Sequence, residues 1–358
     1  MHAFLVAIME DSLFFLKRKH KQPKLRGHVG LDLLGGDRVD SLFIKQTLCA
    51  VAKRVSSHVS ISLFLTQELE KELSSFVEKL TKTSPLKINI VIVSEVIHME
   101  DEPLTAVRKK KDSSLIRSII ALENGSIDAL LSTGNTGALV AATTFHVPFL
   151  KGFNRPLLLA SLPTKKNHSL AVLDVGAHTE ISPKLFEQMA MIGISYKNAQ
   201  GIKEPKVGLL NIGVEEKKGH SQRQITYAQL QSLNTQFPHQ PFVGNVEPSD
   251  VFSGDLHVLL TDGFTGNVFL KTAEGISSFI MEILKENQTH PLLSQKLVKA
   301  IEKELYQEDQ YGALFVGIDR LITKCHGSAS PDAISKSLFY LLGLLSQNFL
   351  AKVKKNLG

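Results

Sequence analysis

The chain has 358 residues, 43% of them hydrophobic and 21% charged, which is the composition of an ordinary globular protein. Lys and Arg outnumber Asp and Glu by 41 to 35, and the net charge of +6 favours an anionic substrate or an acidic partner. The sequence contains no zinc-finger, RNP or basic-zipper pattern, so we expect no nucleic acid partner. Only Cys49 and Cys325 are present, which argues against a disulfide scaffold or a cysteine zinc site and fits a reducing cytoplasm.

The N-terminal segment, residues 1–27, is interpreted as an extension in front of the folded domain. Its first stretch (MHAFLVAIMEDSLFFL) is apolar but interrupted by Glu10 and Asp11, and basic residues follow it. A secretory signal would carry its positive charge first, and a membrane span would need about 20 apolar residues. Two interpretations stay open: an amphipathic helix lying on a membrane surface, or an extension without that role, including a misassigned start codon.

Short β-branched runs alternate with helical patterns from residue 29 onward. The predicted strands are residues 29–33, 59–65, 88–93, 127–131, 157–160, 170–173, 206–211 and 256–261. Predicted helices follow most of them, at residues 67–80, 113–123, 183–196 and 226–233. This alternation predicts an α/β protein with a mostly parallel sheet that is covered by helices on both faces. Sheets of this kind bind ligands at the carboxyl ends of their strands.

The segment from residue 275 to residue 305 has a different pattern. Apolar residues follow a helical spacing on both sides of residues 287–291, which interrupt it, so we expect a helical hairpin excursion. Its apolar face is expected to form a core or dimer surface, with a membrane contact as the alternative. Residues 28–350 are therefore predicted to form one domain that includes the hairpin, followed by a basic C-terminal tail at residues 351–358.

A glycine-bearing loop, STGNTG at residues 132–137, follows the predicted strand that ends at residue 131. Backbone N–H groups at the start of the next helix would point into one small space, and the helix dipole would add to their positive potential. Glycine lets an anion approach the backbone closely, and the Ser, Thr and Asn side chains would add donors. This loop alone could equally be a turn with Ser and Thr caps.

A second stretch, TDGFTGN at residues 261–267, leaves another predicted strand in the same way, with Asp262 before the loop and Asn267 at its end. Two similar loops at two strand exits favour anion binding over simple turns. Neither loop fits the Walker A pattern or GxGxxG, so no dinucleotide site is predicted. We therefore expect these loops to hold a phosphate-like group.

Further motifs stand in order along the chain. They are DLLGGD (32–37), EDEPLTAVRKKKDSS (100–114), STGNTGAL (132–139), KGFNRP (151–156), VLDVGA (172–177), VGLLNIG (207–213), EEKKG (215–219), VGNVE (243–247), TDGFTGNVFLKTAEG (261–275) and HGSAS (326–330). Together they resemble the bacterial phosphate acyltransferases of phospholipid synthesis, from about residue 29 to about residue 348.

This resemblance implies an αβα sandwich of the isocitrate-dehydrogenase-like type, a homodimer, and no metal or organic cofactor. It also implies a cytoplasmic enzyme that can sit at the inner face of the membrane. The implied reaction moves a fatty acyl group reversibly from acyl carrier protein to inorganic phosphate, and a glycerol-3-phosphate acyltransferase then uses the acyl phosphate. Because phosphate is the nucleophile, such a site needs phosphate held in line, donors for the oxyanion and a balancing cation.

The resemblance assigns roles to residues of both loops. Phosphate is expected on the first loop, at Ser132, Gly134, Asn135, Thr136 and Gly137. A second anion or oxyanion loop is expected at Asp262, Gly263, Thr265 and Gly266. The expected catalytic residues are Lys218, as the stabilising cation, and Asn267, as an oxyanion or phosphate donor. A lysine in such a loop could also be merely solvated.

Supporting roles are expected for four more residues, namely Asp32, Asp37, Asn245 and His326. For the two aspartates, capping and loop bracing are preferred over catalysis. His326 could serve the leaving thiol, although a hydrogen-bonded structural role is preferred. The basic run at residues 108–111 could contact an acidic carrier protein or could be a solvated surface.

The chain departs from the usual pattern of the family at three places. His178 stands where relatives carry Asn, His220 and Ser221 follow KKG in place of Asn-Glu, and Ala313 lies where relatives show a YGGAP-like turn. Two histidines near the predicted site could change the pH dependence near neutrality. Ala313 could alter the mouth of an acyl pocket or a dimer contact.

Other readings of the sequence remain open. A phosphotransacetylase-like enzyme would use coenzyme A thioesters, but no dedicated motif for the adenine nucleotide is visible. A dehydrogenase of the isocitrate or isopropylmalate type would share the implied fold but would need a nicotinamide and metal-carboxylate set that is not obvious here. A non-catalytic scaffold at the membrane surface would use the N-terminal segment and the hairpin to recruit lipid-synthesis partners.

Overall fold

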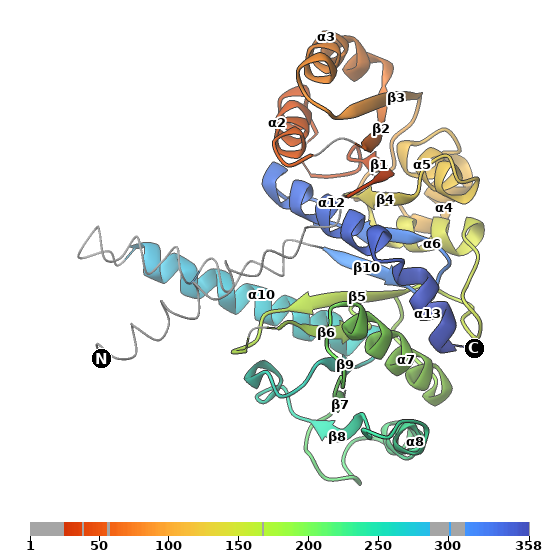
Figure 1. Cartoon of the computed structure of the whole chain (residues 1–358), viewed down its shortest axis with the longest axis vertical. Helices are drawn as coiled ribbons and strands as arrows, with labels where there is room; N and C mark the ends of the chain where they lie inside the picture. Colours follow the sequence, from red (N-terminus) through yellow and green to blue (C-terminus); the bar gives the residue numbers. More distant parts are fainter. Residues whose placement is uncertain are drawn as a thin grey trace.

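A computed structural model of the chain describes residues 25–286 and 312–357, together with residue 301 and apart from residues 38, 56, 57 and 167. The described residues form an 11-stranded mixed sheet in the order β3-β2-β1-β4-β11-β10-β5-β6-β9-β7-β8 (Figure 1). Its strands are β1 (Gly27–Asp32), β2 (Val59–Thr66), β3 (Lys87–Val93), β4 (Ala129–Ser132), β5 (Leu157–Leu162), β6 (Leu170–Leu173), β7 (Val207–Leu210), β8 (Phe242–Val246), β9 (Val258–Leu260), β10 (Ala313–Val316) and β11 (Leu321–Lys324). All predicted strands are confirmed, whereas β8, β10 and β11 were not predicted.

The sheet consists of two parallel halves that run in opposite directions. Strands β3, β2, β1, β4 and β11 are parallel to one another, and so are β6, β9, β7 and β8. Between the halves, β10 pairs antiparallel with both β11 and β5, and β5 pairs antiparallel with β6. Strands β4 and β9 therefore run in opposite directions.

The register nevertheless brings carboxyl ends of both halves to the same place. Lys324, the last residue of β11, pairs with Ala313, and the adjacent Leu314 pairs with Leu159 of β5. Leu159 also pairs with Leu173, the last residue of β6. The two halves thus end at nearly the same level of β5. Because open α/β sheets bind ligands outside the carboxyl ends of their strands, the place where both sets of ends meet is a candidate binding site.

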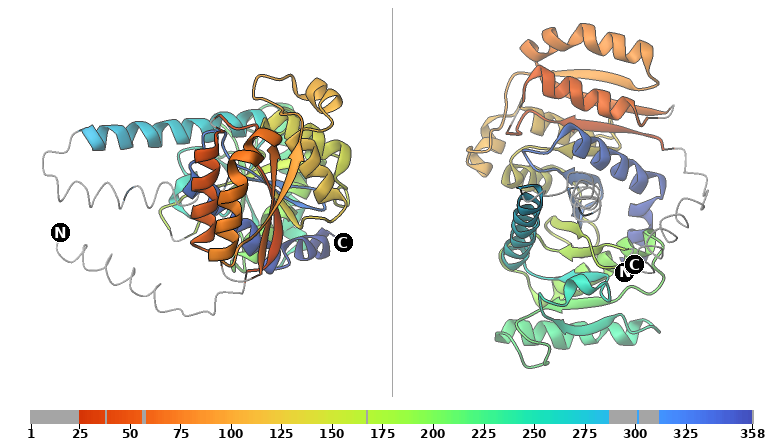
Figure 2. Two further views of the ribbon diagram at one scale, coloured as in Figure 1. Left: turned by 90° about the horizontal axis from the view of Figure 1, so that it is seen from above. Right: turned by 90° about the vertical axis from the view of Figure 1, so that its left-hand side faces the viewer.

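Helices cover both faces of the sheet and confirm the αβα sandwich (Figures 1 and 2). One face carries α2 (Ser41–Ala52), α3 (Gln67–Thr83), α7 (Pro183–Ala199), α8 (Ser221–Gln231), α12 (Pro331–Ser346) and α13 (Phe349–Leu357). The other face carries α4 (Pro103–Lys109), α5 (Ser114–Glu123), α6 (Thr136–His146) and α10 (Gly263–Glu286). The helices bury two separate, largely aliphatic clusters against the sheet, one on each face.

Helix α10 corrects two predictions. Residues 263–267 form its first turns rather than a loop, and the helix continues without interruption through residue 275, where the hairpin was predicted to begin. The cause is at its start, where the Asp262 side chain accepts a hydrogen bond from the backbone N–H of Thr265 (2.8 Å) and so caps the helix. The predicted break at residues 287–291 and the second helix of the hairpin lie outside the described residues.

The two ends of the predicted domain also need correction. Gly27 already belongs to β1, so the extension ends earlier than expected, and residues 1–24 lie outside the described residues. The basic tail predicted from residue 351 is instead most of α13. Val353 is buried, and Asn356 donates to the Ser195 hydroxyl of α7 (2.6 Å), because the apolar face of this short helix packs on the sheet-covering helices.

The outer part of α10 extends beyond the sheet (Figures 1 and 2), and several of its apolar side chains are exposed. Ile276, Phe279 and Ile280 lie there, and Phe279 is 62% exposed. Contiguous apolar surface of this kind marks contacts with proteins or membranes. Within residues 25–286 and 312–357, the structure contains no helix long and apolar enough to cross a membrane. The homodimer and the membrane contact stay predictions.

The start of α10 packs backbone to backbone on the loop that follows β6. A Cβ atom built at Gly266 would lie 1.9 Å from the carbonyl oxygen of Asp174, and one built at Gly263 would lie 2.5 Å from that of His178. The Gly263 N–H donates to the same His178 oxygen (2.8 Å). Glycine is therefore required at these positions for close approach of two backbones, not for flexibility.

We predict that Gly266→Ala lowers the free energy of unfolding by about 2–3 kcal/mol, because neither backbone can move aside for the new methyl group. Gly275→Ala, on the same helix, is the matched control: its Cβ meets nothing within 4 Å, and it should raise the free energy of unfolding by about 0.5–1 kcal/mol. Urea unfolding of the full chain measures both changes. Equal stabilities of the two variants would contradict the close approach.

Candidate active site

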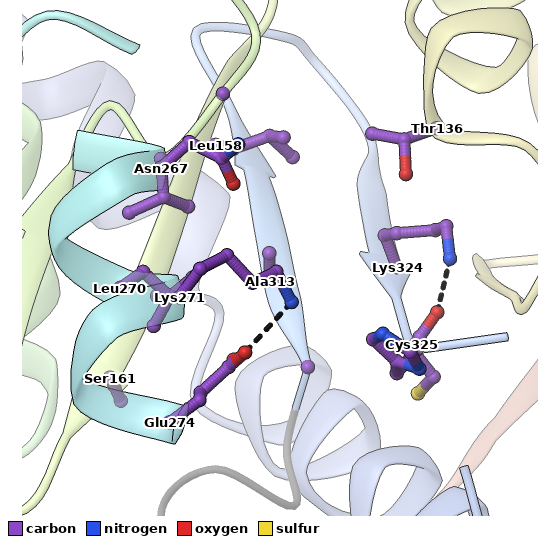
Figure 3. A pocket seen from close by; sticks show the side chains of 15 residues that line it. Thr136, Leu158, Ser161, Asn267, Leu270, Lys271, Glu274, Ala313, Lys324 and Cys325 are labelled. Atoms are coloured by element: carbon purple, nitrogen blue, oxygen red, sulfur yellow. Dashed lines mark hydrogen bonds and ion pairs between the residues drawn. The ribbon is translucent and has the colours of Figure 1, made fainter. Parts of the chain in front are cut away.

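A cavity of about 300 Å³ lies between α6 and α10, over β5 and β10 (Figure 3). It occupies the level at which the two halves of the sheet end. Its lining combines polar groups with an apolar wall: Thr136, Leu158, Ala160, Ser161, Val175, Gly176, Asn267, Leu270, Lys271, Glu274, Gly312, Ala313, Lys324, Cys325 and His326. Concave sites of this kind, mostly apolar with a few convergent polar groups, are typical of small-molecule binding.

Lys324 is the most deeply buried cation of the cavity. Its side chain is 8% exposed, and its Nζ donates to the backbone carbonyls of Thr133 (3.2 Å) and Cys325. The pKa of Lys324 is lowered to about 8, mainly by burial. The charge of Lys271 acts in the same direction, and the neighbouring acidic groups oppose the shift. Lys324 and Lys271 therefore contribute positive charge to the same cavity.

Asp32 lies beneath the first glycine-bearing loop and braces it. Its two oxygens accept hydrogen bonds from the hydroxyls of Ser114 (2.6 Å) and Ser132 (2.7 Å). Burial raises the pKa of Asp32, although these hydrogen bonds and the charge of Lys324 oppose the shift. Ser132 in turn accepts from the Gly134 N–H (3.1 Å). The preferred bracing role of Asp32 fits this geometry, and Ser132 and Gly134 are used inside the loop rather than toward phosphate.

Asn135 has a different role from the one expected. Its side-chain oxygen accepts from the Ala138 N–H (3.0 Å) and caps α6. Its amide nitrogen donates to the backbone carbonyls of His98, Met99 and Asp101, the shortest of these contacts being to Met99 (2.9 Å). These bonds use both ends of the amide, so the prediction that Asn135 donates to phosphate is not supported.

Thr136 and Gly137 form the first turn of α6, and Thr136 lines the cavity. Their backbone N–H groups have no intrahelical partner, as at every helix start, and no hydrogen bond links them to another described residue. The positive end of α6 therefore faces the cavity that holds Lys324. Phosphate binding at Thr136 and Gly137 stays a prediction.

The second predicted anion loop is a capped helix start. Asp262 accepts from the Thr265 hydroxyl (2.9 Å) and from Arg223 (2.8 Å), in addition to the Thr265 N–H. Partial burial raises the pKa of Asp262, but these hydrogen bonds and the Arg223 charge outweigh it and lower the pKa overall. Asp262, Gly263, Thr265 and Gly266 do not line the cavity. Their donors are already satisfied, so they form no anion site.

Asn267 is the residue of this stretch that reaches the cavity. It lies beside Gly176, and a Cβ atom built at Gly176 would be 3.4 Å from the Asn267 side chain. Leu270, Lys271 and Glu274 follow on the same face of α10, at the spacing that places helical residues above one another. Lys271 and Glu274 form an ion pair of 2.8 Å and project from α10 over β10, with Lys324 and Thr136 on the far side (Figure 3).

Lys218 and Asn245 lie outside this constellation. The Lys218 side chain is half exposed and lies 3.9 Å from Glu215, and it does not line the cavity. Asn245 donates to the Glu215 carbonyl (2.8 Å) and so braces the loop that carries Lys218. In the described structure, Lys218 and Asn267 therefore do not line the same cavity, because the loop that carries Lys218 is bound to Asn211 and Asn245, at the ends of β7 and β8.

Of the remaining expected residues, some line the cavity and others do not. His326 lines the cavity, and its Nδ1 accepts from the Ser328 N–H (3.2 Å), which leaves Nε2 to carry the proton of the neutral ring. Asp37 does not line it but contributes to the electrostatics of Lys324. Of the three departures, Ala313 is in the lining, whereas His178 and His220 are not. The two histidines expected near the site are therefore not part of the cavity.

Three charged residues of the cavity were missed. Lys271 and Glu274 stand in the motif TDGFTGNVFLKTAEG, and their helical spacing from Asn267 would have placed them beside it once this stretch was recognised as a helix. Lys324 ends β11, a strand that was not predicted, and its place in the sheet is set by pairing with the distant β4. Within the described residues, no group of three His, Cys, Asp or Glu side chains could hold a metal ion.

Comparison with solved structures supports the fold. A phosphotransacetylase from Streptococcus pyogenes superposes with a TM-score of 0.58 at 12% sequence identity and covers 93% of this chain and 98% of its own. The EutD phosphotransacetylase from Staphylococcus aureus gives a TM-score of 0.57 at 13% identity, with 92% and 96% covered. At these identities the likeness shows the fold alone.

Comparison of sequences goes further. Residues 28–352 match the family described as fatty acid synthesis protein. A phosphate acyltransferase of Chlamydia abortus is 37% identical over 332 residues, covering 92% of this chain and 99% of the relative. One from Streptococcus uberis is 35% identical over 336 residues, covering 91% and 96%. The match spans almost the whole of each relative, and the chain therefore belongs to the bacterial phosphate acyltransferase family.

Proposed function

We propose that the protein transfers a fatty acyl group from acyl carrier protein to inorganic phosphate. The acyl phosphate would then serve as the acyl donor for glycerol-3-phosphate in phospholipid synthesis. The observation that carries this proposal is that Lys271 and Lys324 line the same cavity, which also has an apolar wall. Two cations suit a phosphate dianion, and the apolar wall suits an acyl chain next to its reacting carbonyl.

Phosphate is assigned to the end of the cavity formed by α6 and Lys324. The Thr136 hydroxyl and the free backbone N–H groups of Thr136 and Gly137 would donate to its oxygens, with the helix dipole behind them. Lys324 and Lys271 would balance its charge. The role first given to Lys218 thus passes to two lysines that line the cavity.

The acyl carbonyl is assigned to the end formed by Asn267. When a phosphate oxygen attacks the thioester carbon, negative charge develops on the carbonyl oxygen, and a fixed donor stabilises it most in the transition state. The Asn267 amide lies on the α10 face that borders the cavity and can donate there. Leu158, Ala160 and Ala313 would contact the first carbons of the acyl chain.

The carrier protein would approach from the surface near the start of α6. Arg108 and Lys109 are exposed in the last turn of α4, whereas Lys110 is paired with Asp101 (2.5 Å). Helix α4 packs on α6, since a Cβ at Gly137 would lie 2.7 Å from Pro103. An acidic partner could thus meet the basic residues of α4 while its acyl group enters the cavity.

The decisive test is phosphate-dependent consumption of a long-chain acyl carrier protein thioester, with hydroxylamine trapping of the acyl phosphate. The same acyl chain on coenzyme A runs beside it. We expect an acyl hydroxamate that requires phosphate and forms faster from the carrier thioester. Faster reaction with coenzyme A would assign the protein a phosphotransacetylase-like donor instead, and no trapped product from either donor would refute acyl transfer to phosphate.

Asn267→Ala should lower kcat by about 10²-fold, which is the usual effect of removing one transition-state donor. Lys218→Ala is the matched control, because that lysine lies outside the cavity, and it should retain kcat within about twofold. The hydroxamate assay measures both rates, and melting temperatures show that both variants are folded. A large loss in Lys218→Ala with little loss in Asn267→Ala would contradict this placement of the site.

The lowered pKa of Lys324 predicts that the affinity for phosphate decreases at alkaline pH. Its folded pKa of about 8 is below the usual value of 10.5, so the ammonium is charged below pH 8 and increasingly neutral above it. The value of kcat/KM for phosphate should therefore fall up to about tenfold per pH unit above pH 8. Lys324→Met should be low at every pH and lack this limb. A wild-type profile that stays flat to pH 10 would exclude Lys324 as the phosphate cation.

The same shift affects stability with a defined sign. Between pH 8 and pH 10.5 the unfolded chain binds the lysine proton more tightly than the folded chain does, so the contribution of Lys324 to the free energy of unfolding rises with pH in that window. The stability of Lys324→Met should lack this contribution. Urea unfolding at several pH values separates it from the loss of activity.

A further inference from the structure

Glu274 is the one carboxylate among the described residues that line the cavity. It stands on the same face of α10 as Asn267 and Lys271, and its carboxylate lies 2.8 Å from the Lys271 ammonium. The Lys271 ammonium offsets this charge, and a phosphate that contacts Lys271 would lie next to the carboxylate. An ionised carboxylate there can accept a hydrogen bond from a phosphate O–H group.

We propose that Glu274 accepts a hydrogen bond from the protonated oxygen of hydrogen phosphate, selects this anion over fully deprotonated ones, and carries its proton toward the leaving sulfur. This inference rests on the proposed function and adds a proton-transferring residue to it. Lys271 holds the carboxylate in the cavity in the absence of substrate, since the two charges attract each other at 2.8 Å.

Selection follows from the chemistry of the acceptor. An ionised carboxylate can only accept hydrogen bonds. Hydrogen phosphate and hydrogen arsenate each carry one O–H group that can donate to it, whereas sulfate has none at neutral pH. Sulfate would therefore face the Glu274 charge without a hydrogen bond. A site built around one particular hydrogen bond rejects an analogue that lacks it far more strongly than a site built on shape or charge alone.

The proton transfer balances the reaction. An unprotonated oxygen of hydrogen phosphate attacks the acyl carbon and forms the new C–O bond, the C–S bond breaks, and its electron pair leaves with sulfur. The phosphate proton passes to the Glu274 carboxylate and from there to the thiolate. The products are the acyl phosphate dianion and a neutral thiol, and Glu274 returns to its ionised form. Proton transfers of this kind contribute about 10²–10⁴-fold to rate.

The test compares the full-length chain with Glu274→Gln and with the control Glu282→Gln. Glu282 lies on the same helix, exposed and outside the cavity. Calorimetry without any acyl donor measures binding of phosphate, arsenate and sulfate to each protein. We expect wild type and Glu282→Gln to bind phosphate and arsenate at least about 10²-fold more tightly than sulfate. In Glu274→Gln the three affinities should fall within about threefold of one another.

Turnover gives the second readout. Glu274→Gln should lower kcat at saturating phosphate by about 10²-fold while its melting temperature shows a folded chain. Wild type that binds sulfate as well as phosphate, or a Glu274→Gln variant that still rejects sulfate, would overturn the selection. An unchanged kcat would overturn the proton step. Preference for a coenzyme A donor alters only the proposed function, whereas wild type that binds no phosphate at all overturns both.

Discussion

The reversal of strand direction across β10, β5 and β6 is the constraint on which the rest of the structure depends. Two parallel half-sheets that ran the same way would gather their carboxyl ends along one edge. Here they run in opposite directions, and Leu159 of β5 pairs with both β10 and the end of β6, so the two sets of ends meet over the centre of the sheet. Helices α6 and α10 therefore begin on either side of one cavity, although their preceding strands run in opposite directions.

This meeting point is held together by buried polar groups. Asp32 fixes the loop before α6 through Ser114 and Ser132, and the loop after β6 is fixed by the fully buried Asp174, which accepts from the N–H groups of Leu158 and His178. Both carboxylates act inside the fold, and neither lines the cavity. Their effect is to set where the helix starts lie, so that the charged groups of the cavity come from α10 and β11.

The architecture could be read from the sequence because long buried strands leave continuous apolar runs. β10 and β11 were not predicted, and their pairing is set by partners that are distant in the sequence. The site divides in the same way. Thr136 and Asn267 stand at helix starts that glycine-bearing motifs mark, whereas Lys324 depends on the register of a short strand. The role of Asn135 could not be predicted from the local sequence, because an Asn that follows a strand can either cap the next helix or bind an anion.

Helix α10 is both a wall of the cavity and a rod that projects from the body of the protein. Glu274, on the wall, and Ile280, on the exposed part, are separated by about 9 Å along the helix axis. No glycine or proline interrupts the helix between them except Gly275, which has open space around it. A rotation or tilt of the outer segment would therefore also move Lys271 and Glu274. Binding of a partner to that apolar surface would in this way change the position of the charged groups in the cavity.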